Sequence, residues 1–474
     1  MSVLHEDNDR TVIIDNLSSI EKFFKFGHYT ILLCIIYAGI IFNTSTFFSS
    51  QEKVYISQHK GYVLFEFVFG SIGIFIGSVC SDKFGRKKAT IASFTTANII
   101  GLSYLILPDF SFLYYIRLVQ FLFIGMSFSI VSVFVLEQVS NKDRYWILSV
   151  FCWPAAMIVD RIVTIITRKW IIVGTLNFVV FLIVMYLIYK VQESPRWLLS
   201  HGYMKEGKEC LKQISLMNSH DHLNDADIND AIFDEYRNIY QYNQERRQFS
   251  LCSLFFSKKY LPYIFIMASI SIINNIIRYG AFTYMLIHEV DGIKMIFAFT
   301  GDVLVYFPIL GNALVEYKYK NVGRKTIFQG SIIFLIVSYV LTNTGRVLGL
   351  FSTIIPYGTM IHVLLFATSS QMLIVIHMII IELFPTPIRN RAYGMNDLVA
   401  GIGTMIGIGV TGLYKEESSI LFVPFLIAIV IFTGIFSFVI PETKNQDLRD
   451  CLPRERMDHL DVEMLQGDNN YFEL

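Results

Sequence analysis

Charged side chains inside long apolar stretches are the residues of this 474-residue chain that could do chemistry. A charge is costly in an apolar surrounding, so such residues usually bind a charged solute, carry a proton or pair with one another. Seven of them are spread along the chain: Glu66, Arg117, Asp160, Arg161, Arg278, Asp302 and Asp397. Asp160 and Arg161 are adjacent, so on a helix they point about 100° apart and do not simply neutralise each other.

Two of the acids are the main candidates for a solute site. Asp302 lies about 12 Å from the outer end of its apolar stretch, and Asp397 lies about 8 Å from the inner end of its own. Arg278 lies about 25 Å from the inner end of its stretch and could extend outward to the surface. We predict that Asp302 and Asp397 face a cavity and favour a cationic or zwitterionic organic solute. The alternative is that each acid pairs with a neighbour or serves helix packing.

The stretches that carry these residues have the length and composition of membrane-spanning helices. The chain is 54% apolar and 16% charged, with a mean hydropathy of +0.50, whereas a soluble domain carries about 25% charged residues. A helix needs roughly 20 apolar residues to cross a bilayer. This composition excludes a disordered chain and argues against a soluble enzyme. We predict twelve spans, at 28–48, 61–80, 89–107, 112–136, 146–167, 170–190, 261–287, 294–315, 326–344, 357–381, 392–412 and 420–440.

Basic residues predict the orientation of the spans. When both termini are placed in the cytoplasm, most of the 39 Lys and Arg residues fall in inside segments, as the positive-inside rule requires.

The numbers of basic and acidic residues are equal, at 39 each, so net charge gives no reason to expect a nucleic-acid partner. We therefore expect a monomeric, multi-pass protein of the plasma membrane, in contact with the lipid bilayer. No phosphate loop, nucleophile triad or metal-ligand cluster is evident, so no cofactor and no metal is expected.

Charged motifs at the inner ends of the spans occur twice, about half a chain length apart. Three motifs recur in the same order: Gly85-Arg86-Lys87 and Gly323-Arg324-Lys325, then Glu137 with Arg144 and Glu382 with Arg389, then Glu193 with Arg196 and Pro441 with Lys444. The repeat predicts two six-helix halves, at 28–190 and 261–440. A cytoplasmic linker with short helices, 191–260, would join them, and the segments 1–27 and 441–474 would flank them in the cytoplasm. Parallel repeats of this kind are typical of transporters.

The motifs themselves resemble those of a known family. Asp82–Lys87 has the D-x-x-G-R-K pattern of the major facilitator superfamily. Glu193–Leu198, Glu382–Thr386 and Pro441–Lys444 are together similar to segments of the organic cation/anion transporter family of animal solute carriers. Sugar porters share some of these segments, but they carry a paired glutamine where this chain has Ala268–Asn275 without one. The resemblance therefore favours the organic ion branch.

The resemblance implies an all-α polytopic membrane protein with the major facilitator fold. It implies a secondary transporter, not an enzyme, that moves a small organic ion by alternating access, with the solute site between the halves near the bilayer midplane. The substrate gradient, an exchanged solute or a coupled ion would supply the energy, and no single acid stands out as a proton carrier. Two alternatives stay open: a transporter of a neutral, sugar-like solute, and a transporter-like receptor or scaffold that does not turn over.

The resemblance also implies an inner latch made of the repeated motifs. Arg86 would pair with an acid at the inner end of another span while the cavity faces outward, and the pair would break when the cavity opens inward. The alternative is that these residues only set loop geometry and orientation. Lys320 stands where the second motif should have an aspartate, which predicts a weaker second half. The candidate gating residues are Asp82, Gly85, Arg86, Glu137, Arg144, Glu193, Arg196, Gly323, Arg324, Glu382, Arg389 and Glu442.

The family's charge pattern does not transfer to the predicted solute site. The positions where the resemblance places charged binding residues fall on Tyr306, Phe366 and Gly401, which are all neutral. Asp302 and Asp397 each lie one helical turn from one of these positions. Arg278 stands where an aromatic residue is usual, followed by the expected Tyr279. The candidate substrate-binding residues are therefore Arg278, Tyr279, Asp302, Tyr306, Phe366, Asp397 and Gly401.

Overall fold

The described part of the chain is helical throughout, with no strands. The computed structural model describes residues 26–49, 60–106, 113–167, 170–218, 261–287, 294–319, 321–348, 357–413, 434–435, 437–444 and 448. Six stretches of the described helices are long and apolar enough to cross a membrane. The predicted twelfth span, 420–440, lies almost entirely outside the described residues.

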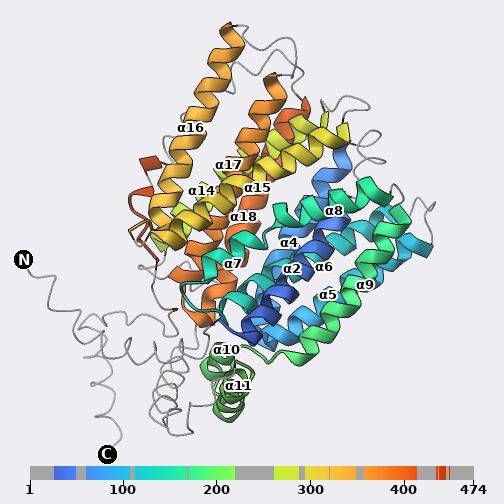
Figure 1. Cartoon of the computed structure of the whole chain (residues 1–474), viewed down its shortest axis with the longest axis vertical. Helices are drawn as coiled ribbons and strands as arrows, with labels where there is room; N and C mark the ends of the chain where they lie inside the picture. Colours follow the sequence, from blue (N-terminus) through green and yellow to red (C-terminus); the bar gives the residue numbers. More distant parts are fainter. Residues whose placement is uncertain are drawn as a thin grey trace, which may run out of the picture.

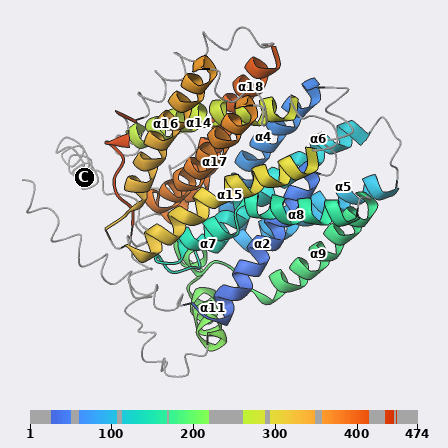
Figure 2. The same ribbon diagram turned by 45° about the horizontal axis from the view of Figure 1, so that its top comes forward.

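The helices of the first half form one group, and those of the second half form another (Figure 1). The first group contains α2 His28–Ser49, α4 Lys60–Phe84, α5 Arg86–Ile106, α6 Leu113–Leu136, α7 Arg144–Val150, α8 Trp153–Thr167 and α9 Trp170–Lys190. The second contains α14 Leu261–Ile287, α15 Lys294–Lys318, α16 Arg324–Leu348, α17 Tyr357–Leu383 and α18 Thr386–Leu413. Two short helices, α10 Pro195–Ser200 and α11 Met204–Met217, lie together at one end of the bundle (Figure 2).

Glycines allow the closest approaches between helices within each half. A Cβ on Gly73 of α4 would lie 2.0 Å from the backbone oxygen of Leu122 on α6. A Cβ on Gly403 of α18 would lie 2.2 Å from the backbone oxygen of Ile272 on α14. Small residues at such contacts let helix backbones meet in a bilayer, where no hydrophobic force drives helices together.

The predicted fifth span, 146–167, matches the candidate span Arg144–Thr167, which consists of two helices, α7 and α8. Pro154 lies in the first turn of α8 and has no N–H to donate to the carbonyl of Val150. That carbonyl instead accepts a hydrogen bond of 2.9 Å from the hydroxyl of Tyr306 on α15. The break therefore ties the first half of the molecule to the second.

Several pairs of helices join the halves along the bundle. α18 packs against α4, and α15 packs against α8 and α7. The remaining space between the halves forms a cavity, and the inner ends of α4, α5, α17 and α18 meet beside α10. These two places hold the candidate functional residues.

Candidate functional site

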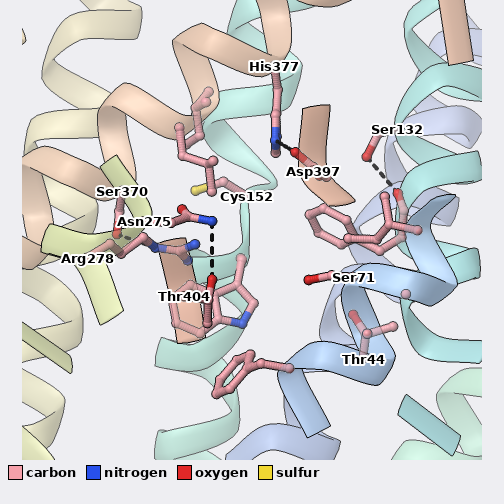
Figure 3. Close-up of a pocket in the computed structure, with 18 of the residues that line it drawn as sticks. Thr44, Ser71, Ser132, Cys152, Asn275, Arg278, Ser370, His377, Asp397 and Thr404 are labelled. Atoms are coloured by element: carbon pink, nitrogen blue, oxygen red, sulfur yellow. Dashed lines mark hydrogen bonds and ion pairs between the residues drawn. The ribbon is translucent and has the colours of Figure 1, made fainter. Parts of the chain in front are cut away.

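A cavity lies between the two halves and is lined by both of them (Figure 3). Its apolar wall is mostly aromatic: Tyr37, Phe67, Phe121, Phe128, Trp153, Tyr279, Phe282 and Phe366. Its polar lining residues are Thr44, Glu66, Ser71, Ser132, Asn275, Arg278, Ser370, His377, Asp397 and Thr404. A largely apolar pocket with a few placed polar groups is typical of a small-molecule site.

Arg278 is a buried cation held by ring faces. Its guanidinium carbon lies 5.0 Å from the ring centre of Trp153, 5.1 Å from that of Tyr279 and 5.7 Å from that of Phe366. Its Nε donates a hydrogen bond of 3.3 Å to the Ser370 hydroxyl. In the described part of the chain, no carboxylate lies within ion-pair distance of it. Cation–π contacts stabilise the charge without neutralising it, so the cavity keeps a positive site.

Asp397 lies in the same cavity and is bound by its neighbours. Its Oδ1 lies 2.8 Å from Nε2 of His377 on α17 and also accepts a hydrogen bond of 3.3 Å from Asn396. The other ring nitrogen of His377 lies 3.2 Å from the Tyr393 hydroxyl. These contacts therefore fix the orientation of the Asp397 carboxylate, and the His377 imidazole is its ionisable partner.

The second acid of the described lining, Glu66, is neutralised. Glu66 on α4 forms an ion pair with Arg117 on α6, with contacts from both Nε and Nη2. Glu66 therefore adds no net charge to the cavity.

Three of the predicted substrate-binding residues do not line this cavity. Asp302 forms an ion pair of 3.2 Å with Arg161, at the contact of α15 with α8. Each of the two predicted acids has a polar partner, as the alternative to a solute-binding role requires, and Asp302 does not face the cavity. Tyr306 is bonded to the Val150 carbonyl, and Gly401 lies against α4, where a Cβ would come within 2.6 Å of the Ser71 hydroxyl. The sequence gives the depth of a residue on a helix but not the rotation of that helix.

The sequence reasoning missed two cavity residues that the geometry makes prominent. His377 lies in an apolar run that contains no Asp, Glu, Lys or Arg. Histidines within such runs are the sequence signal that identifies it. Trp153 begins α8 directly before a proline, and the break of the helix there brings its ring over Arg278. For Trp153, the proline that follows it is the sequence signal that indicates the break.

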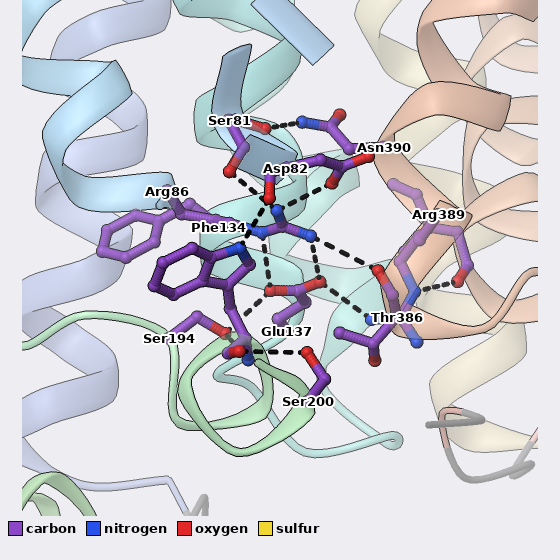
Figure 4. Close-up of polar contacts among 12 residues, drawn as sticks. Ser81, Asp82, Arg86, Phe134, Glu137, Ser194, Ser200, Thr386, Arg389 and Asn390 are labelled. Atoms are coloured by element: carbon purple, nitrogen blue, oxygen red, sulfur yellow. Dashed lines mark hydrogen bonds and ion pairs between the residues drawn. The ribbon is translucent and has the colours of Figure 1, made fainter. Parts of the chain in front are cut away.

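The inner end of the bundle is closed by a buried cluster of charges (Figure 4). Arg86 contacts Asp82 at 2.7 Å and Glu137 at 3.3 Å. Arg389 of the second half reaches the same Glu137 at 2.9 Å, and the side chains of Arg86, Glu137 and Arg389 are 0% exposed. Ser194 donates to the other oxygen of Glu137 at 2.7 Å. One carboxylate therefore joins two guanidinium groups that belong to different halves.

The cluster shifts the pKa of its central acid. Burial raises the pKa of the Glu137 carboxyl, but the charges of Arg86 and Arg389 outweigh that effect and lower the pKa below its usual value. The carboxylate is therefore ionised at neutral pH, as the ion pairs require.

Further contacts cross between the halves beside this cluster. Arg391 lies 3.2 Å from Asp82, and the side chain of Asn390 donates to Ser81. These contacts bring the beginning of α18 against the end of α4, so the inner side of the cavity is closed.

The second copy of the motif has carboxylate partners of its own. Arg324 contacts Glu316 at 3.2 Å and Glu382 at 2.9 Å. Glu316 lies one helical turn before Lys320, a position outside the described residues, and it was not among the predicted gating residues. Lys444 also reaches Glu316, at 3.6 Å. Arg324 thus has two acid partners although Lys320 replaces the expected aspartate.

Two glutamates cap the helices that follow the glycines. Glu193 accepts hydrogen bonds from the backbone N–H of Arg86 and Lys87, at 2.9 and 3.0 Å. A carboxylate suits the positive end of a helix and satisfies its free N–H groups. Burial raises the pKa of Glu193, and these backbone bonds oppose the rise. Gly85, at φ 98°, makes the turn, and a Cβ there would lie 2.6 Å from the Glu193 carboxylate.

The equivalent cap in the second half has the same form. Glu442 accepts hydrogen bonds from the backbone N–H of Arg324 and Lys325, at 2.9 and 3.1 Å. A Cβ on Gly323 would lie 2.0 Å from its carboxylate. Glu193 and Glu442 therefore cap the helices whose first residues, Arg86 and Arg324, form the ion pairs at this end of the bundle.

The remaining predicted gating arginines hold backbone carbonyls. The Nε of Arg144 donates to Leu136 and Val139, and the Nε of Arg389 donates in the same way to Ile381 and Phe384. These bonds satisfy carbonyls at the ends of α6 and α17. In a separate contact, Arg196 donates to the carbonyl of Leu448 at 3.4 Å, which joins α10 to the segment after the second half.

Comparison with known proteins gives the class that this fold and site define. A family model described as "Sugar (and other) transporter" matches residues 19–451. The chain is 26% identical over 384 residues to the "Putative transporter B0361.11" of Caenorhabditis elegans, covering 78% of this chain and 61% of that protein. It is 24% identical over 399 residues to "Organic cation transporter 1" of the same organism, covering 80% and 63%. The chain spans less than two thirds of the length of these two relatives.

The fold is also similar to that of solved structures. The structure of the proton:xylose symporter XylE bound to 6-bromo-6-deoxy-D-glucose matches with a TM-score of 0.69 at 16% identity, covering 89% of this chain and 97% of that one. The inward-open conformation of XylE from E. coli matches with a TM-score of only 0.58.

The chain therefore belongs to the sugar (and other) transporter family of the major facilitator superfamily. With six candidate membrane spans in the part of the chain that the structure describes, it is an integral, multi-pass membrane protein. Its substrate class is not settled by these relatives, which include transporters of organic cations and of sugars.

Proposed function

We propose that the protein transports a small organic zwitterion across the plasma membrane by alternating access. The observation that carries the proposal is that Arg278 and Asp397 line one cavity between the halves. In this proposal the halves 28–190 and 261–440 rock about the cavity, and the linker 191–260 joins them. Both termini lie in the cytoplasm, and the protein acts as a monomer.

The charges of the cavity favour a solute that carries both signs. Arg278 presents a positive charge to the cavity, and Asp397 presents a negative charge whenever His377 is neutral. A lone cation would bind Asp397 but leave a second cation, Arg278, in the same apolar space. Burying a charge without a partner costs several kcal/mol. A zwitterion gives each charge a partner, and the aromatic wall covers its apolar part.

Neutral, sugar-like solutes are the second candidate. Asn275 donates to the Thr404 hydroxyl at 3.3 Å inside the cavity, and Ser71 and Thr44 add further hydroxyl groups. Such groups could bind the hydroxyls of a sugar. A neutral solute gives no partner to the charged side chains of Arg278 and Asp397, so we rank this candidate below the first.

Uptake of a mixed pool of organic zwitterions, cations, anions and sugars tests the proposal. We expect accumulation of zwitterions in cells that express the wild type. Arg278→Gln and Asp397→Asn should each reduce uptake at least tenfold, at matched surface levels. Leu182→Val, on an exposed part of α9, is the control for surface substitution. Accumulation of cations or sugars alone contradicts the proposal, and the absence of any turnover supports a receptor or scaffold.

A further inference from the structure

Four polar residues of the second half form a chain of contacts at the cavity, which we call the His377 cluster: Asn396, Asp397, His377 and Tyr393. The imidazole bridges Asp397 at 2.8 Å and Tyr393 at 3.2 Å, and its ring lies 4.7 Å from that of Tyr393. His377 and Asp397 both line the cavity, so water and solute can reach them. Neither contact belongs to the inner cluster of charges.

The imidazole can hold either charge state without losing a hydrogen bond. When it is neutral, Nε2–H donates to Asp397 and Nδ1 accepts from the Tyr393 hydroxyl. When it is protonated, both nitrogens donate, and the Tyr393 hydroxyl turns toward Ser132, with which it also hydrogen-bonds. Histidine is the side chain whose ordinary pKa lies closest to neutral pH. The geometry thus places a proton carrier against the carboxylate that faces the solute.

We propose that His377 carries a proton that leaves when the cationic group of the substrate binds Asp397, so that the protein exchanges its substrate for a proton. The inference rests on the proposed function, because it gives Asp397 the cationic end of the solute. The substrate ammonium and the imidazolium compete for one carboxylate. When the ammonium donates to Asp397, the proton passes from the imidazole to cavity water, and the neutral ring remains. Proton binding on the other side of the membrane reverses the step and releases the solute.

The other titratable groups around the cavity are less suited to this role. Glu66 on α4 is already neutralised by Arg117, and Arg278 on α14 holds its proton permanently. Tyr279 on α14 and Tyr37 on α2 are phenols. Phenols, like the thiol of Cys152, which also lines the cavity, ordinarily titrate well above neutral pH. Within the described part of the lining, the imidazole and carboxylate of the His377 cluster therefore remain as the carriers.

The cluster is placed to report to both halves. Ser132 belongs to α6 of the first half, so rocking of the halves changes what the Tyr393 hydroxyl can bond to. Arg389, which joins Glu137, lies about 12 Å further down α18 than Asp397. One helix therefore carries the proton site and part of the closed inner end.

Proteoliposomes with a transported zwitterion and an internal pH dye test the exchange, with the membrane potential held at zero. In the wild type, inward movement of substrate should drive protons outward. A gradient of one pH unit, acid inside, should give about tenfold accumulation, because one proton moved over one pH unit is worth one factor of ten. His377→Gln keeps neutral hydrogen bonds to Asp397 and Tyr393. We expect it to transport the substrate down its own gradient, with no proton movement and no accumulation. Leu182→Val should behave as the wild type.

Each result decides one of the two proposals. Wild-type transport without proton movement, proton movement in the same direction as substrate, or unchanged exchange in His377→Gln overturns the inference and leaves the zwitterion proposal standing. If only a cation is transported, the same assay is run with that cation. Outward proton movement then supports the exchange although the zwitterion proposal has failed. A protein that transports neither class overturns both.

Discussion

The carboxylate of Glu137 lies at the centre of the contact between the halves at the inner end. It lies between Arg86 of its own half and Arg389 of the other, and all three side chains are fully buried. A buried carboxylate between two guanidinium groups is costly to remove, because it leaves two buried cations facing each other. The gating role that the sequence suggests for this residue therefore has a direct test.

Glu137→Gln should shift the protein toward the state that opens to the cytoplasm. Breaking a buried ion pair costs about 3–5 kcal/mol, and the pair with Arg389 is the one that joins the two halves at the closed inner end. A cysteine introduced at Ser71 in the cavity should then react with a membrane-impermeant thiol reagent applied from the cytoplasmic side. The exposed Lys142→Gln on the adjacent loop is the matched control. Equal labelling of the two variants would show that Glu137 serves only local structure.

The difference in labelling of the same introduced cysteine between the wild type and Glu137→Gln should be independent of pH between about 5 and 8. The pKa of Glu137 is lowered below its ordinary value, which is near 4.5. A carboxylate with a lowered pKa contributes stability above its unfolded pKa and loses it only as pH falls through the folded value. The contribution of Glu137 to the closed inner end should therefore weaken only below about pH 4.5. If the difference changes between pH 8 and 5, a group other than Glu137 controls closure.

At the scale of elements, the positions of the helices could be predicted and their rotations could not. Apolar runs located the described helices to within a few residues, except where Pro154 breaks the predicted fifth span. The side chain of Asp302 points to α8 and not into the cavity because α15 packs against α8 there. His377 is not evident when only Asp, Glu, Lys and Arg are taken as the ionisable residues of a span. Which helices pair with one another depends on how they pack, and the sequence of one apolar run does not contain that information.

The two glycine turns give a test of the repeat at this scale. Gly85→Ala should destabilise the protein by about 1–2 kcal/mol from backbone strain, because Gly85 has a φ of 98°. Further loss comes from the cap, since the new Cβ would lie 2.6 Å from Glu193. Gly323→Ala meets only the flexible end of Glu442 and has no such strain, so its loss should be smaller. Thermal unfolding in detergent measures both, and equal losses would mean that the cap, not the turn, dominates.

At the scale of the whole molecule, the closed inner end requires a close contact between two helices of different halves. A Cβ on Gly394 of α18 would lie 2.1 Å from the hydroxyl oxygen and 2.6 Å from the Cβ of Ser78 on α4. Gly409 on the same helix would meet nothing described within 4 Å. The two positions share a helix and a residue type but differ in what the opposite half presents. They therefore separate an effect on the helix from an effect on the contact of the halves.

Gly394→Leu should act as a wedge that holds the inner end open. Leucine favours the helix over glycine by about the same amount at either position, so local stability is matched by Gly409→Leu. Only the wedge at 394 is incompatible with the packing of α18 against α4. We expect Gly394→Leu to expose a cavity cysteine at position 71 to cytoplasmic reagent, to protect it from outside reagent, and to lower uptake at least tenfold. Gly409→Leu should leave all three unchanged. If both variants retain uptake and outside labelling, the contact of α18 with α4 is not required for alternating access, because the halves then move without separating there.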